Sequence, residues 1–540
     1  MTGPDKKLAV IGLGPRGTGA LEALADLASA RGLKVQADVF DPYPAPGAGP
    51  NFDPRESPLC RLNIPMRDIE LRAPDSLGVV PLADWLDPPI DRDVFPARSD
   101  LGAYLQHRLD ALSDAPGLAL ARISARVDAF QQTNEGWQVQ AGGTWHGPYA
   151  EVLLVPGQPE TEPDDQLAEW QAHSHTTNAA LAPAYPARDL QHRAEDWHGK
   201  TVAVRGFALS SFDVIRVLSQ GVGGKFTEQG YVPSGREPRC ILPFSLDGNP
   251  PSPKPETEEL DARFEPTAEE TAAFDSAIHD AARGPSKRVS TLITESLLPP
   301  VRRILAECGA ETTEQDISDW FDLEWSDPGT QDQTGPVRAL RDGIAMADGS
   351  LPPSIGYVVG QVWRKWQNPL RQGYNPADTS PETADVLVGF DEGLKRFSYG
   401  PPVSACRELL ALIDAGLVST DLSKDPEITL TEKGWLLETE GHEEEAEVMI
   451  DAVLPSPDPR LIKAQPVPAL IEAGWITMLG ELSARTAPDG RLIGSDDRPV
   501  PGLSLLGRLA LGSVIAVDSL HDCFGMASTR WAEGVLGRIG

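Results

Sequence analysis

Three glycines near the start of the chain are spaced so that main chain alone could hold a diphosphate. Gly12, Gly14 and Gly17 lie in GLGPRG, between an apolar run at 8–11 and apolar residues that recur at helical spacing from Ala20. In such a turn the first glycine permits a tight bend, the second lets a pyrophosphate approach the backbone, and the third lets helix and strand pack closely. The N–H groups at the start of the helix would then face the phosphates.

An acid at the end of the next expected strand extends this pattern. That strand runs from about 34 to 40 and is followed by Asp41, 24 residues after Gly17. A carboxylate at this place accepts hydrogen bonds from ribose hydroxyls. The order strand, glycine turn, helix, strand, acid predicts dinucleotide binding, and the alternative is a glycine turn that merely packs.

A second strand-to-helix turn lies in the middle of the chain. Residues 199–213 read GKTVAVRGFALSSFD, with Gly206 after an apolar strand and helical spacing from Ser210. Ala208 stands where the second glycine would be, which brings a methyl group to the point of closest phosphate approach. This turn either binds a nicotinamide dinucleotide or is a structural relic of the same fold. Its candidate contacts are Gly206, Ala208, Ser210 and Ser211.

Composition excludes several other classes of protein. The 540 residues carry a formal net charge of −33, which argues against a surface for nucleic acid or for anionic lipid. The five cysteines are widely separated, so no metal site or disulfide framework is expected. Neither an apolar run of membrane-spanning length nor a signal-peptide pattern is present, and we therefore expect a cytoplasmic protein.

Motifs along nearly the whole chain resemble one known family. The sequence is similar to the bacterial FAD-NAD(P)-binding proteins, relatives of the flavin-dependent N-hydroxylating monooxygenases. The motifs, in the family's order, are GLGPRG (12–17), DPYPAPGAG (41–49), LNIPMRDI (62–69), FPARSDLGAYL (95–105), VRGFALSSFDV (204–214), YVPSGREPR (231–239), SYGPP (398–402), LPSPDP (454–459) and GRLALGSVIAVDSL (507–520). The resemblance identifies the cofactor better than the substrate, because no substrate-reading motif is recognisable.

The resemblance implies a role for particular residues. The FAD pyrophosphate would be held by the first glycine turn, the adenosine ribose by Asp41, and the flavin ring would lie near the 62–69 loop, with Asn63 as the candidate catalytic residue. The turn at Gly157 resembles the place where flavoproteins leave the FAD domain, although a plain strand end is the alternative. The implied cofactor contacts are Gly12, Gly14, Pro15, Arg16, Gly17, Asp41, Asn63, Arg98 on the adenine side, Gly157, and Asp518 near the ribityl chain or phosphate.

The expected fold is α/β, with two dinucleotide-binding (Rossmann-like) domains, the first discontinuous, and a largely helical insertion. The Pro-rich stretch 248–259 is expected to be mobile, and Trp363 and Trp366 to be packing residues. The expected parts are the first piece of the FAD domain (1–160), a polar linker and second nucleotide-binding-like unit (161–255), a helical insertion (256–390), a return segment with strands (391–449) and the second piece of the FAD domain (450–540).

These features predict an FAD-dependent oxidoreductase. The first hypothesis is a monooxygenase that uses NADPH or NADH and O₂ to oxidise the nitrogen of a small amino acid or amine. The cofactor carries the difficult step in such an enzyme, so no separate acid–base motif is required. The alternatives are an FAD-dependent oxidase or dehydrogenase without oxygen insertion, and a flavin-binding regulatory or scaffold protein. The oligomeric state is left open.

Overall fold

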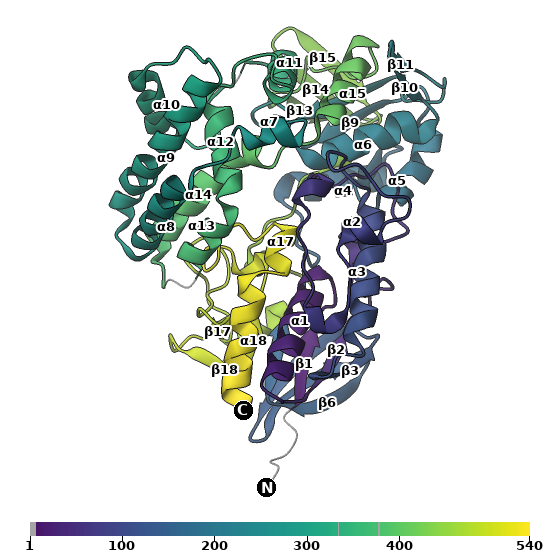
Figure 1. Ribbon diagram of the computed structural model, residues 1–540. Coiled ribbons are helices and arrows are strands. Elements are labelled where there is room, and N and C mark those ends of the chain that lie inside the picture. The colour runs from purple at the N-terminus through teal and green to yellow at the C-terminus, as the bar shows by residue number, and fades with distance from the viewer. Residues whose placement is uncertain (1–6, 333, 376–377) are drawn as a thin grey trace.

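The computed structural model describes residues 7–332, 334–375 and 378–540, and its main elements are a mostly parallel sheet, a second sheet that is parallel throughout, and a group of helices (Figure 1). The strands are β1 (Lys7–Ile11), β2 (Val35–Phe40), β3 (Leu118–Ile123), β4 (Val127–Thr133), β5 (Gly136–Ala141), β6 (Thr144–Tyr149), β7 (Glu151–Leu154), β8 (Ala180–Pro183), β9 (Thr201–Arg205), β10 (Lys225–Thr227), β11 (Gly230–Val232), β12 (Cys240–Phe244), β13 (Glu427–Leu430), β14 (Trp435–Thr439), β15 (His442–Ala446), β16 (Val448–Asp451), β17 (Arg491–Ile493) and β18 (Pro499–Leu505).

Helices cover the sheets and form most of the segment between residues 258 and 414. They are α1 (Pro15–Ala30), α2 (Leu82–Trp85), α3 (Arg98–Leu112), α4 (Asp165–Thr176), α5 (Ala187–Ala194), α6 (Leu209–Ser219), α7 (Glu258–Ala262), α8 (Ala268–Arg283), α9 (Val289–Glu307), α10 (Glu314–Ser326), α11 (Pro336–Ala347), α12 (Ile355–Lys365), α13 (Gln367–Tyr374), α14 (Pro381–Ser398), α15 (Val403–Asp414), α16 (Val467–Glu472), α17 (Leu520–Cys523) and α18 (Met526–Ile539). Within the described ranges, every helix is too short or too polar to cross a bilayer.

The first sheet joins the two ends of the chain. Its strand order is β17-β18-β7-β1-β2-β3, and all neighbours are parallel except β17 and β18. Strand β1 is apolar and buried on both faces because α1 and α18 cover one face and the β4–β6 sheet packs toward the other. Helix α18, yellow in Figure 1, lies beside the purple α1.

The second sheet is parallel throughout and has the order β12-β9-β16-β8. Strand β8 lies in the first part of the segment 161–255, where a polar linker is expected, so this linker also contributes an edge strand. The expected α/β fold with two nucleotide-binding-like sheets is confirmed.

The helical part has an aromatic core. Trp363 and Trp366 are buried, and the Trp366 ring stacks on Phe274 with centroids 4.3 Å apart. The Trp363 indole donates to the Asp391 carboxylate at 2.7 Å. The packing role expected for these two tryptophans is therefore confirmed. At the start of α8, Thr267 and Glu270 form a capping box.

The prediction that the Pro-rich stretch is mobile is wrong. The unit built on the first sheet is called the first unit below, and the unit built on the second sheet the second unit. Pro250, Pro251 and residues 253–255 are buried between the first unit and the helical part. The backbone amide of Ser252 donates to the Arg396 carbonyl at 2.9 Å. The segment also passes so close to Gly400 that a side chain on that residue would collide with it. The proline content of the stretch reflects an extended path, and the surfaces that enclose it come from distant parts of the chain.

Candidate nucleotide-binding site

The three glycines of the first turn have three different surroundings. Gly12 has a φ of +104°, and a Cβ built there would lie 2.3 Å from the Val155 carbonyl oxygen. A Cβ on Gly17 would lie 2.5 Å from the Gly12 carbonyl oxygen. The first and third glycines are therefore required by the fold itself: one for the tight turn at the end of β1, the other for the close packing of α1.

Gly14 differs because its side-chain direction is open among the residues that the structure describes. Of their atoms, the Gly49 Cα alone comes within 4.0 Å of a Cβ built there. Gly14 is the N-cap of α1 in an extended conformation (φ −86°, ψ −165°), and no side chain caps the helix. Two glycines from separate loops thus face each other in front of a helix N-terminus, and this bare backbone fits a diphosphate. The contribution of Gly49 was not predicted, although it lies in the glycine-containing motif 41–49.

Asp41 lies at the carboxyl end of β2, as expected, and fixes the shape of the turn. One carboxylate oxygen accepts a hydrogen bond from the Leu13 amide at 2.6 Å, and the other accepts one from the Tyr43 amide at 2.7 Å. Each oxygen keeps a second lone pair for another donor. Asp41 can therefore hold the glycine loop in place and still accept a hydroxyl hydrogen bond.

Two of the predicted cofactor contacts have side chains that are engaged elsewhere. The Arg16 guanidinium pairs with the Asp522 carboxylate at 2.7 Å and donates to the Val517 carbonyl, so it ties α1 to the C-terminal segment. Arg98 begins α3 and pairs with Asp213 of α6 at 2.9 Å, which ties the first unit to the second. The sequence motifs identified the elements on which these two residues lie. In the structure, their side chains form ion pairs that connect different elements of the fold.

The other predicted contacts lie on separate loops. Asp518 pairs with Lys395 at 2.8 Å and with Arg508 at 3.1 Å. Burial opposes its ionisation, but the two cations keep the pKa of Asp518 below its usual value. Asn63 is half-buried, and its backbone carbonyl accepts a hydrogen bond from the Lys254 amine. Gly157 has a φ of +64° with open space in its side-chain direction.

The second turn repeats the backbone of the first. Gly206 has a φ of +102°, and its amide donates to the Phe244 carbonyl at 2.8 Å, as the Gly12 amide donates to Phe40 at 2.9 Å. Ala208 is the N-cap of α6, with φ −101° and ψ −158°. It is exposed and takes the place that Gly14 has in the first turn.

The later residues of the second turn follow the same correspondence. Ser211 takes the place of Gly17, is fully buried, and donates to the Ala208 carbonyl at 2.6 Å. Ser210 is half-buried beside it. Strand β12 lies beside β9 as β2 lies beside β1, and the residue that follows β12 is Ser245. The second turn therefore has a hydroxyl where the first turn has the Asp41 carboxylate.

Two acids that sequence reasoning missed connect the two units. The Glu56 carboxylate, 5% exposed, accepts hydrogen bonds from the backbone amides of Ala187 and Arg188 at 3.0 and 2.8 Å. It thereby satisfies the N-terminus of α5 in the second unit. Asp53 accepts a hydrogen bond from the Tyr43 hydroxyl at 2.8 Å and pairs with Arg188 at 3.5 Å. These contacts join the loop that carries Asp53 and Glu56 to the start of α5.

Among the described residues, no group of three or more His, Cys, Asp or Glu side chains is arranged to hold a metal ion.

Comparison with known proteins agrees with the first glycine turn. Residues 9–159 match the sequence family described as FAD-NAD(P)-binding. The chain is 27% identical over 533 residues to nitrosuccinic acid synthase npaA of Aspergillus oryzae, covering 86% of this chain and 81% of that protein. It is also 27% identical over 560 residues to an L-aspartate N-monooxygenase (nitrosuccinate-forming) of Streptomyces davaonensis, covering 84% and 83%.

The fold has solved counterparts as well. The ornithine N-hydroxylase of Kutzneria sp. 744 superposes with a TM-score of 0.51 at 12% identity, covering 99% of this chain and 100% of that one. At this identity the likeness concerns the fold alone. Residues 9–159 are thus similar to FAD-NAD(P)-binding domains, in a chain similar along most of its length to a nitrosuccinic acid synthase and to an L-aspartate N-monooxygenase.

Proposed function

We propose that the protein is an FAD-dependent N-monooxygenase that uses NAD(P)H and O₂ to oxidise the amine nitrogen of a small amino acid. The observation that carries this proposal is the bare cradle formed by Gly14 and Gly49 at the N-terminus of α1. The two curated relatives, each aligned over more than four-fifths of this chain, are named for nitrosuccinate formation, and one is named for aspartate. Aspartate is therefore the first substrate to test.

Residues of the first turn would hold FAD. Backbone N–H groups at the start of α1 would bind the diphosphate, and Asp41 would accept the ribose hydroxyls while it keeps the Leu13 amide in place. Asn63 and Asp518 would lie toward the flavin end. Bound FAD would supply the redox chemistry at this site, which is the transfer of electrons from NAD(P)H to O₂.

The second turn would hold the nicotinamide dinucleotide. Its support is the backbone that it shares with the first turn, with Gly206 at the bend and Ala208 at the helix N-cap. Ser210 and Ser211 are the further candidates. The exposed Ala208 methyl group lies where the phosphates would approach, so binding here would be weaker than at a glycine.

We also propose that the FAD unit is built from residues 1–160 and 450–540. The support for this division is that β18 pairs with β7 in the same sheet as β1. Residues 161–255 with the return segment 391–449 would form the nicotinamide unit, and residues 256–390 the helical insertion. The strands β9, β12 and β16 support the second unit.

The experiment that tests the function is anaerobic mixing of the purified flavoprotein with NADPH or NADH, followed by an oxygen-uptake screen over amino acids. We expect the nicotinamide to bleach the flavin, and aspartate to increase oxygen uptake and to yield an N-oxidised product by mass spectrometry. Bleaching by an amino acid alone would instead identify an oxidase. Flavin that neither reagent reduces would identify a binding or scaffold protein.

A further inference from the structure

A buried lysine lies on the extended segment between the first unit and the helical part. Lys254 is 5% exposed, and its backbone amide donates to the Pro401 carbonyl at 3.1 Å. The preceding carbonyl, of Pro253, accepts a hydrogen bond from the Tyr357 hydroxyl at 2.9 Å. The helical part therefore fixes the backbone of this segment, and the Lys254 side chain extends from it toward the first unit.

Lys254 and Arg67 connect two backbone segments reciprocally. The Lys254 amine donates to the backbone carbonyl of Asn63, in the loop 62–69. Arg67, four residues further along that loop, donates to the carbonyl of Pro255 at 2.9 Å. The Arg67 side chain is 2% exposed and also pairs with Asp93 at 2.5 Å. Each of these two buried basic side chains thus donates to a backbone carbonyl of the opposite segment.

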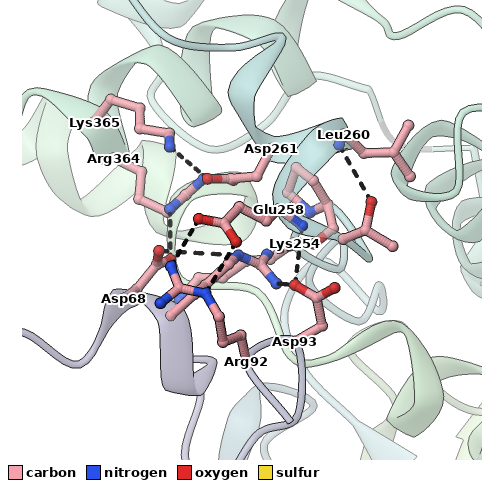
Figure 2. A network of polar contacts seen from close by, with 12 residues as sticks. Asp68, Arg92, Asp93, Lys254, Glu258, Leu260, Asp261, Arg364 and Lys365 are labelled. Carbon is pink, nitrogen blue, oxygen red and sulfur yellow. Dashed lines mark hydrogen bonds and ion pairs between the residues drawn. The ribbon is translucent and has the colours of Figure 1, made fainter. Parts of the chain in front are cut away.

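Charged groups from three elements surround the amine (Figure 2). Arg364 of α12 pairs with Asp68 of the loop at 3.3 Å and with Asp261 of α7. Burial, and next the Arg364 cation, lower the pKa of Lys254 to about 7, whereas Asp68 and Asp261 raise it. A desolvated amine costs stability, and an apolar side chain of similar length would fill this space at a lower cost. Packing alone therefore does not account for a lysine here.

We propose that Lys254 is a positioning residue of the flavin site, which fixes the 62–69 loop against the helical part through the Asn63 carbonyl. This inference rests on the proposed function, which places that loop beside the flavin. Oxidation of a substrate nitrogen requires a site that excludes water, because O₂ is otherwise reduced to hydrogen peroxide. A loop that opens more often would let water enter and divert the electrons of NAD(P)H to peroxide.

The test uses the full-length chain with Lys254→Met, which removes the donor and nearly keeps the volume. Lys365→Met is the matched control: Lys365 pairs with Asp261 and Glu265 in the same network and comes from α12. In Lys254→Met we expect the 62–69 amides to exchange hydrogen about tenfold faster before FAD is added. We also expect weaker FAD binding by fluorescence titration, with Lys365→Met close to wild type in both measurements.

A kinetic measurement separates positioning from a general loss of structure. In flavin-loaded Lys254→Met we expect NADPH-driven flavin reduction at the wild-type rate, with less N-oxidised product and more peroxide for each NADPH consumed. If Lys254→Met does not fold, Arg67→Gln breaks the reciprocal bond to Pro255 and should give the same faster exchange. Equal exchange and FAD affinity in Lys254→Met and Lys365→Met would overturn the inference. Absence of FAD binding by the wild type would instead refute the proposed function.

Discussion

Gly14 and Ala208 occupy the same place in two turns and differ by one methyl group. Each is the N-cap of the helix that directly follows a buried parallel strand, β1 or β9, and their backbone dihedral angles agree within about 15°. Both conformations are open to any L-amino acid. The difference between the two residues therefore acts on whatever approaches the helix N-terminus, and it has little effect on the fold.

This relationship predicts the effect of Ala208→Gly. Removal of the methyl group should let the diphosphate of NADPH or NADH approach the backbone, so we expect a several-fold lower Kd for the preferred nucleotide. The measurement is the nucleotide dependence of anaerobic flavin reduction. Flavin content serves as the internal control and should not change. A higher Kd, or no change in Kd, would show that the dinucleotide does not approach Ala208.

Gly17→Ala should destabilise the protein directly. The new methyl group would lie 2.5 Å from the Gly12 carbonyl oxygen, so α1 must shift away from β1, at a cost of about 1–3 kcal/mol. Thermal unfolding of the flavin-free protein measures this cost. Gly537→Ala in α18 is the control, because a Cβ there meets no atom within 4 Å. Equal melting temperatures for the two variants would contradict the packing role of Gly17.

The buried amine of Lys254 predicts a pH dependence of stability. Burial, and next Arg364, lower the pKa of Lys254 in the folded chain to about 7, from 10.5 in the unfolded chain. Between these values the unfolded state binds the extra proton, so stability rises with pH, by at most about 1.4 kcal/mol per pH unit. We expect the free energy of unfolding of wild type relative to Lys254→Met to increase from pH 7 to pH 10. A constant difference over that range would refute this environment for Lys254.

The sequence predicted those parts of the site that depend on local backbone geometry. GLGPRG and Asp41 lie at the ends of β1 and β2 as expected, because a strand-to-helix turn needs glycine at fixed spacing. The approach of Gly49 to Gly14 depends on the path of a loop, and the engagement of Arg16 by Asp522 joins residues 506 positions apart. Residue spacing along one element carries no information on such contacts.

The wrong prediction for the Pro-rich segment has the same origin. Proline content indicates an extended chain without regular secondary structure, and this property is common to mobile linkers and to buried connections. This segment is a buried connection because Gly400 has no side chain and so lets the segment pack against it. The carbonyls of Arg396 and Pro401 also accept hydrogen bonds from its backbone amides. The contact between the Lys254 amine and the Asn63 carbonyl likewise depends on these distant surfaces.

The most direct test of the central claim is the FAD content of Gly14→Val beside that of wild type. The claim is that bare backbone at Gly14 and Gly49 holds the FAD diphosphate. We predict one FAD per wild-type chain, and a Gly14→Val protein that folds with a melting temperature near that of flavin-free wild type but binds no FAD. A Gly14→Val protein with full flavin content, or wild-type protein that stays colourless after incubation with FAD, would contradict the account.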